Sequence, residues 1–104
     1  MQDTTVRWEL PEAYDTDDGV VRWARLGTGG GPVVLVHGTP YSSYLWRDIA
    51  PALARTRTVH VFDLLGYGQS DKHEGQDLTL AAQARRFARL LEHWGPRRAE
   101  RRRG

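Results

Sequence analysis

The sequence predicts an α/β fold that opens with an antiparallel hairpin and continues as strand, helix, strand and helix. Three observations support this fold class. Residues 33–36 form an uninterrupted apolar run, which is typical of a strand buried on both faces of a parallel sheet. Residues 58–62 form a second short run of strand-forming side chains, and residues 79–94 carry apolar side chains at helical spacing. Strands that alternate with helices in this way pair in parallel through right-handed crossovers.

The hairpin is predicted from the first quarter of the chain. Residues 20–26 combine β-branched and aromatic side chains and predict a strand, and residues 6–10 predict a weaker one. Residues 15–19 between them carry the Asp, Thr and Gly side chains that are typical of turns. The glycine-rich segment 27–32, which ends in proline, is expected to interrupt regular structure before the strand at 33–36.

The first helix is predicted to run over residues 44–54. Ser42 and Ser43 precede it and are candidates for its N-terminal cap. Pro51 lies inside this span and is expected to end, kink or restart the helix. The residues expected on its buried face are Leu45, Ile49 and Leu53.

The second helix is predicted over residues 79–94, and Gly95-Pro96 gives it a clear end. The opposite face is charged. The residues expected on the apolar face are Leu80, Ala84, Phe87, Leu91 and Trp94.

The composition is that of a globular protein, with 39% hydrophobic and 27% charged residues among 104. The chain contains no cysteine, which excludes a disulfide scaffold, a cysteine zinc site and a thiol nucleophile. The net charge is +2, but the last eight residues hold five arginines and one glutamate, so the basic charge lies at the C-terminus. We therefore expect a cytoplasmic protein without a membrane segment and without a nucleic-acid-binding face.

The candidate chemistry lies in the loop after residues 33–36, which reads His37-Gly38-Thr39-Pro40. A glycine at this point allows a sharp turn at the carboxyl end of a strand, where α/β sheets bind ligands. The backbone N–H of Thr39 is therefore a candidate donor to a developing oxyanion. Taken alone, the His-Gly pair fits a plain strand-to-helix turn as well.

A resemblance to the α/β-hydrolase superfamily is carried by VVLVHGTPYSSYLWRDIAPALA, by VHVFDLLGYGQSDK and by a helix that ends in LLEHWG. In particular, residues 20–95 resemble the branch that contains epoxide hydrolases and haloalkane dehalogenases. The resemblance implies that the backbone N–H of Thr39 is one donor of an oxyanion hole, with His37 and Gly38 as the scaffold of its loop. It implies scaffold roles for Asp63 and Ser70, although the position of Asp63 at a strand end also fits a nucleophile.

Members of this superfamily place a nucleophile on a sharp strand-to-helix turn, followed by an acid and a histidine. In this chain the resemblance ends at Gly95, before any such turn, and all four histidines precede that point. We therefore expect residues 1–95 to be the N-terminal portion of a hydrolase domain, truncated before the nucleophile and inactive alone. In the family's sheet the strand at 33–36 would border the missing strand, so we expect an open edge and a tendency to aggregate.

The resemblance implies hydrolysis of an ester, an epoxide or a related bond of a small molecule in the full-length parent. Dehalogenation is disfavoured, since Thr39 stands where the dehalogenases commonly carry asparagine. No cofactor or metal is expected, because no second histidine follows His73 at metal-ligand spacing and the glycines at 27–31 precede a strand. Residues 96–104 are interpreted as a disordered tail or a frameshift product. The alternative is a non-catalytic interaction module whose basic tail binds an acidic partner.

Overall fold

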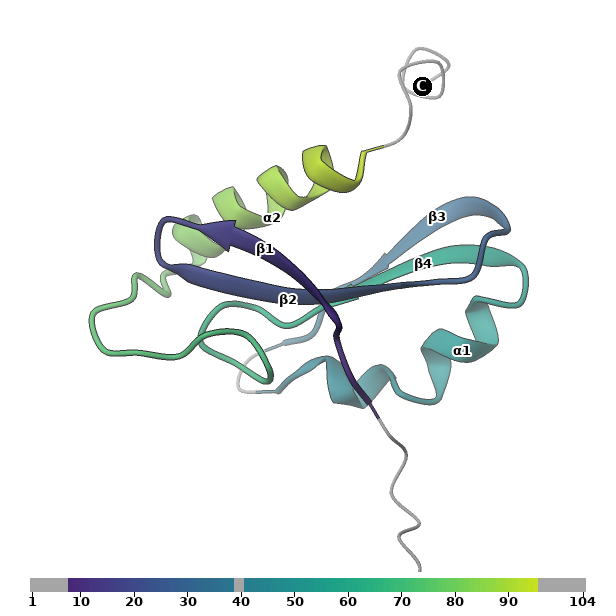
Figure 1. Cartoon of the computed structure of the whole chain (residues 1–104), viewed down its shortest axis with the longest axis horizontal. Coiled ribbons are helices and arrows are strands. Elements are labelled where there is room, and N and C mark those ends of the chain that lie inside the picture. Colours follow the sequence, from purple (N-terminus) through teal and green to yellow (C-terminus); the bar gives the residue numbers. More distant parts are fainter. Residues whose placement is uncertain (1–7, 39–40, 96–104) are drawn as a thin grey trace, which may run out of the picture.

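A four-stranded mixed sheet lies between two helical layers, with α1 below the sheet and α2 above it in Figure 1. The computed structural model describes residues 8–38 and 41–95. In chain order the elements are β1 (Glu12–Thr16), β2 (Gly19–Leu26), β3 (Gly30–Leu35), the 3-10 helix η1 (Ser43–Trp46), α1 (Ile49–Leu53), β4 (Arg57–Phe62) and α2 (Leu80–Trp94). This order confirms the predicted hairpin, strand, helix, strand and helix.

The strands lie in the order β1-β2-β4-β3. The pairs β1–β2 and β2–β4 are antiparallel, and β3 pairs with β4 in parallel, with Val33 beside Val59 and Val34 beside His60. Within the described residues β3 is thus an edge strand. Because it pairs on one side only, it is half-exposed, whereas the sequence predicted burial on both faces.

The first strand of the hairpin is not where the sequence predicted it. β1 begins at Glu12, and residues 8–10 form no strand. Instead, the backbone of this segment hydrogen-bonds to the side-chain amide of Gln69. The Leu10 N–H donates to Gln69 Oε1 at 2.9 Å, and Gln69 Nε2 donates to the Trp8 carbonyl oxygen at 2.8 Å. Pro11, which has no N–H for a sheet ladder, separates the segment from β1. The predicted turn is confirmed at Asp17 and Asp18.

The segment predicted to be irregular, 27–32, contributes the start of β3 at Gly30. The strand pairing has an irregularity between Gly30 and Pro32. A Cβ on Gly29 would lie 2.5 Å from the carbonyl oxygen of Thr56, so the two segments approach too closely for any other residue. The glycines therefore allow this segment to pack directly against the backbone of Thr56, which precedes β4.

The predicted helix at 44–54 is split into η1 and α1. Ser42 caps η1, since its hydroxyl accepts the N–H of Tyr44 at 3.2 Å. Pro51 occupies the third position of α1, where a missing N–H breaks no helical hydrogen bond. The predicted buried face is wrong at Leu45 and Ile49, which are 41% and 46% exposed. A 3-10 turn advances by three residues per turn instead of 3.6, so the periodicity does not carry through from Leu45 to α1.

α2 forms within one residue of its predicted start, and the Thr79 hydroxyl caps it by accepting the N–H of Ala82 at 3.2 Å. The predicted apolar face is only partly correct. Trp94 is buried, but Leu80 is 86% and Leu91 40% exposed, while Leu90 is buried. The face of α2 that packs against the sheet is therefore rotated around the helix axis relative to the predicted face. As a result, Leu80 and Leu91 are exposed.

Two apolar clusters lie on opposite faces of the sheet. On the α2 face lie Val21, Trp23, Phe62, Leu65, Leu90 and Trp94. On the α1 face lie Leu10, Ala24, Ala50, Val59 and Val61. The alternation of side chains along β4 sends neighbouring residues to opposite clusters, as a strand requires. In the described part of the chain, no helix is long and apolar enough to cross a membrane.

Candidate functional site

The loop after β3 begins with a buried histidine that is fixed on both ring nitrogens. The Leu64 N–H donates to His37 Nε2 at 2.9 Å, so that nitrogen is unprotonated. The proton is therefore on Nδ1, which donates to the carbonyl oxygen of Gly38 at 2.8 Å. The Tyr41 N–H donates to the same Gly38 oxygen at 2.9 Å. His37 thus connects the loop after β3 to the loop after β4.

Gly38 itself is open to solvent on its Cα side. A Cβ built on this residue would meet no atom within 4 Å. The next residue, Thr39, lies outside the described residues, as does Pro40. The structure therefore describes His37 and Gly38, which precede the predicted donor, and shows that Gly38 is open on its Cα side.

Asp63, at the end of β4, is 1% exposed and uses both carboxylate oxygens. Oδ1 accepts the N–H of Ser43 at 2.6 Å, and Oδ2 accepts the N–H of Gln69 at 2.7 Å. His37 Nε2 lies 3.9 Å from Oδ1. A carboxylate that holds two loops in this way has no oxygen directed at an open site, so its geometry favours the scaffold role over the nucleophile role.

Ser70 is similarly engaged inside the fold. Its hydroxyl donates to the carbonyl oxygen of Asp63 at 2.6 Å and accepts the N–H of Arg22 at 2.8 Å. Ser43 Oγ accepts the indole N–H of Trp8 at 2.9 Å. These contacts join the segment before β1, the start of η1 and the loop after β4 into one network around Asp63.

Sequence reasoning did not single out Trp8 or Gln69 as members of this network. Their partners lie 35 and about 60 residues away along the chain. Neither residue has a local pattern that signals such a contact. The Gln69 amide takes the place of a neighbouring strand in bonding the backbone of residues 8–10. This contact can be recognised only from the three-dimensional arrangement of the loops.

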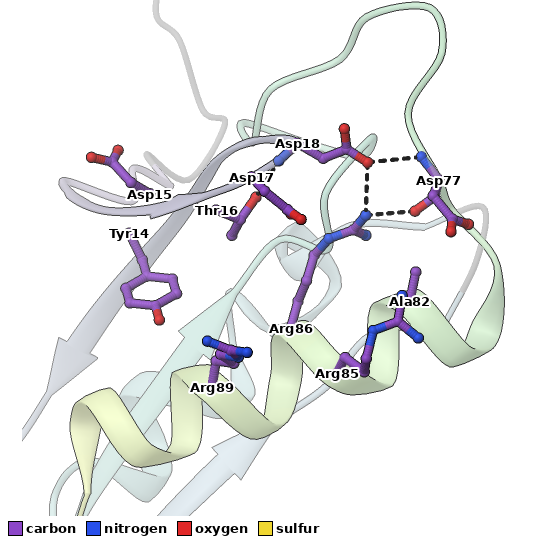
Figure 2. A pocket seen from close by; sticks show the side chains of 10 residues that line it. All are labelled: Tyr14, Asp15, Thr16, Asp17, Asp18, Asp77, Ala82, Arg85, Arg86 and Arg89. Carbon is purple, nitrogen blue, oxygen red and sulfur yellow. Dashed lines mark hydrogen bonds and ion pairs between the residues drawn. The ribbon is translucent and has the colours of Figure 1, made fainter.

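A charged pocket of about 300 Å³ lies between the β1–β2 turn and the start of α2 (Figure 2). Arg86 Nη2 lies 3.1 Å from Asp18 Oδ2 and donates to the Asp77 carbonyl oxygen at 2.6 Å. The Asp77 N–H donates to the same Asp18 oxygen at 2.9 Å. Arg86 therefore fastens the hairpin turn to α2. Among the described residues, no group of three acidic, histidine or cysteine side chains is arranged to hold a metal ion.

A second pocket, of about 430 Å³, lies between α2 and the edge strand β3. His60 projects from β4 into its wall and stacks on Trp94, with ring centroids 4.7 Å apart. Arg25 Nε–H donates to His60 Nε2 at 3.0 Å. Burial, together with the charge of Arg25, lowers the pKa of His60 to about 4, so its imidazole is neutral at physiological pH.

Comparisons with known proteins agree with this architecture. Residues 31–99 match the family model described as alpha/beta hydrolase fold. The chain is 33% identical over 82 residues to haloalkane dehalogenase 2 of Mycobacterium bovis, covering 79% of this chain and 28% of that protein. It is 54% identical over 43 residues to the soluble epoxide hydrolase of Corynebacterium sp. strain C12, covering 41% of this chain and 15% of that enzyme.

A crystal structure of an alpha/beta hydrolase fold protein from Burkholderia ambifaria superposes with a TM-score of 0.77 at 44% identity, covering 84% of this chain and 32% of that protein. The chain thus spans less than a third of the length of these relatives. The described sheet and helices correspond to the N-terminal part of the shared fold, and its relatives include epoxide hydrolases and haloalkane dehalogenases. The chain belongs to the α/β-hydrolase fold family.

Proposed function

We propose that this chain supplies the N-terminal part of a hydrolase that cleaves an ester, an epoxide or a related bond of a small molecule through a covalent intermediate. Its contribution to the chemistry is the backbone N–H of Thr39, which donates to the developing oxyanion. His37 and Gly38 form the support of that donor. Residues 1–95 are proposed as the hydrolase portion, and the match to the family model extends over residues 31–99, into the arginine-rich segment 96–104.

One observation carries the proposal: two donors hold the carbonyl oxygen of Gly38, namely His37 Nδ1–H and the Tyr41 N–H. In a trans peptide unit the N–H points away from the C=O. The Gly38 carbonyl and the N–H of Thr39 belong to the same peptide unit, so the two hydrogen bonds to this carbonyl support the proposed donor. A donor that is held before the reaction begins needs no reorganisation when charge develops, which is what an oxyanion hole requires.

The chain alone is proposed to be inactive. Asp63, whose position at a strand end also fits a nucleophile, is committed to hydrogen bonds inside the fold, and so is the Ser70 hydroxyl. A hydrolase that loses one oxyanion donor loses about 2.7–4 kcal/mol of transition-state stabilisation. Loss of the nucleophile costs a serine protease about a million-fold in kcat. An isolated oxyanion loop therefore gives no measurable turnover.

The test uses a chimera in which residues 1–95 replace the corresponding segment of the Corynebacterium soluble epoxide hydrolase. Thr39→Pro removes the N–H and is expected to lower kcat for epoxide hydrolysis by about 100- to 1000-fold. Thr39→Ala keeps the N–H and removes only the hydroxyl, so it is expected to stay within about threefold of the unaltered chimera.

Circular dichroism and thermal unfolding of both variants establish that they are folded. Equal activity of the folded Thr39→Pro and Thr39→Ala variants would show that the backbone N–H is not a donor. A large loss in Thr39→Ala alone would assign the role to the hydroxyl instead.

A further inference from the structure

We propose that His73 forms a pH-dependent connection between the loop after β4 and the β1–β2 turn. In its charged form the imidazole bridges two carbonyl oxygens, those of Glu74 and Asp18, and in its neutral form it releases one of them. The connection lies in the loop of residues 71–77, which precedes α2, and it is independent of the proposed oxyanion donor.

Both ring nitrogens of His73 face carbonyl oxygens. Nδ1 lies 2.9 Å from the carbonyl oxygen of Glu74, and Nε2 lies 3.0 Å from that of Asp18. A neutral imidazole has one N–H and one lone pair, so it can donate to only one of these two acceptors. At the other nitrogen a lone pair would face the lone pairs of a carbonyl oxygen. Only the imidazolium, which carries a proton on each nitrogen, forms both hydrogen bonds.

Two other histidines in the described part of the chain have ring hydrogen bonds, and their partners differ from those of His73. His37 Nε2 accepts the N–H of Leu64, and His60 Nε2 accepts the Nε–H of Arg25. Each of these rings thus has a donor that fits an unprotonated nitrogen. His73 has two acceptors instead, and this set of partners fits the charged ring.

The Asp18 carbonyl is held in place by the turn to which it belongs. The Asp18 N–H donates to Thr16 Oγ1 at 3.1 Å, and the Thr16 hydroxyl donates to the Gly19 carbonyl oxygen at 2.6 Å. Gln76 Nε2 donates to the Asp18 carbonyl oxygen at 2.9 Å, which leaves the second lone pair of this oxygen for His73. The acceptor is therefore in position before His73 is protonated.

The surroundings of His73 favour its charged form. The hydrogen bonds to the Glu74 and Asp18 carbonyl oxygens hold the pKa of His73 above its ordinary value of 6.5. The carboxylates of Asp18 and Asp71 act in the same direction, and loss of hydration opposes them. Because the pKa is raised in the fold, the contribution of His73 to stability is present below pH 6.5 and is lost as the pH rises through the raised pKa.

Other charged side chains of this region are engaged elsewhere. Lys72 donates to backbone carbonyl oxygens of the preceding turn. Arg86 of α2 lies 3.1 Å from Asp18 Oδ2, on the carboxylate and not on the carbonyl (Figure 2). The Asp77 carboxylate accepts the Thr79 hydroxyl at 2.8 Å. None of these three groups occupies the Asp18 carbonyl oxygen.

The loop of residues 71–77 also contacts the β1–β2 turn without His73. The Asp77 N–H donates to Asp18 Oδ2 at 2.9 Å, and the Val20 N–H donates to Asp71 Oδ2 at 2.8 Å. Protonated His73 adds one more hydrogen bond to this contact. We therefore expect deprotonation of His73 to loosen the loop from the turn while the sheet stays folded.

The experiment follows the imidazole signals of His73 by NMR in the histidine-labelled 104-residue chain and in the chimera described above. The chimera contains every residue of the contact, so the test holds where the isolated chain aggregates. His73→Gln identifies the signals by their loss. The reference is a peptide of residues 70–78, which keeps the flanking charges but lacks Asp18. We expect a higher titration midpoint in the folded proteins than in the peptide, also in about 1 M salt, where the Debye length is about 3 Å.

Hydrogen exchange of the Asp77 N–H tests the connection itself, because its acceptor is Asp18 Oδ2. After correction for the intrinsic exchange rate, this amide is expected to lose protection as the pH rises through the midpoint of His73. His73→Gln removes the titrating ring and is expected to abolish this pH dependence while the protein remains folded. His93→Gln is the matched control, since His93 is also exposed but lies in the last turn of α2, and it is expected to leave the pH dependence unchanged.

Circular dichroism establishes that each sample is folded. The proposal is overturned if the midpoint of His73 in the folded proteins equals that in the peptide. It is also overturned if the higher midpoint disappears at high salt, which would assign it to the charges of Asp18 and Asp71 alone. An Asp77 N–H with the same pH dependence in His73→Gln as in the unaltered protein would contradict it as well.

Discussion

Replacing Asp63 by asparagine tests whether this carboxylate is a structural junction or a reacting group. It accepts two backbone N–H groups, from Ser43 at 2.6 Å and from Gln69 at 2.7 Å, and is 1% exposed. Hydrogen bonds to a charged group contribute about 1.5–3 kcal/mol each. An asparagine retains one acceptor and turns an NH₂ group toward the other N–H. We therefore expect Asp63→Asn to lower the free energy of unfolding by about 2–3 kcal/mol.

The measurement is equilibrium urea unfolding of the chimera defined above. Asp71→Asn is the control, because Asp71 also accepts one backbone N–H, from Val20 at 2.8 Å, but at an exposed position. There the amide can rotate to present its oxygen, and the expected loss is below about 1 kcal/mol. Equal losses for the two variants would refute the junction role. Abolished turnover with unchanged stability in Asp63→Asn would instead identify a reacting carboxylate.

Two further predictions concern stability. Gly68→Ala is expected to destabilise the chimera by about 2–4 kcal/mol, since its Cβ would lie 2.2 Å from Asp63 Oδ2 at a φ of +55°. Gly75→Ala has a positive φ but no neighbour within 4 Å, so it should cost only about 1–2 kcal/mol; equal unfolding free energies would contradict the clash. Because the pKa of His60 is lowered to about 4 in the fold, its contribution to stability is present above pH 6.5 and is lost as the pH falls toward 4. After discounting for screening by solvent at the groove, this loss is about 1–2 kcal/mol in pH-dependent unfolding, and it should be absent in His60→Phe.

The order of elements could be predicted from the sequence because each signal is local. The Asp17–Asp18 turn and the Ser42 cap involve partners within a few residues. Hydrophobic runs of the right length then identified β3, β4 and α2. Local chemistry was sufficient wherever the partner is close in the sequence.

The faces of the helices and the first strand could not be predicted, because their partners are distant. Within residues 8–10, the Trp8 carbonyl and the Leu10 N–H form hydrogen bonds with the side chain of Gln69. This contact requires the loop after β4 to fold back against the segment before β1. The exposure of Leu91 depends on which strands α2 covers. At the site, the His37 and Gly38 loop was found from its motif, whereas the contact between His37 and Leu64 required the structure.

The central claim is that this chain carries part of a hydrolase site and depends on the rest of the fold for turnover. The most direct measurement compares initial rates of epoxide hydrolysis by the 104-residue chain, by the chimera and by buffer. The account predicts that the chain alone is no faster than buffer and that the folded chimera hydrolyses the substrate. Turnover by the chain alone that disappears in Asp63→Ala or Ser70→Ala would contradict it, as would a folded chimera without activity.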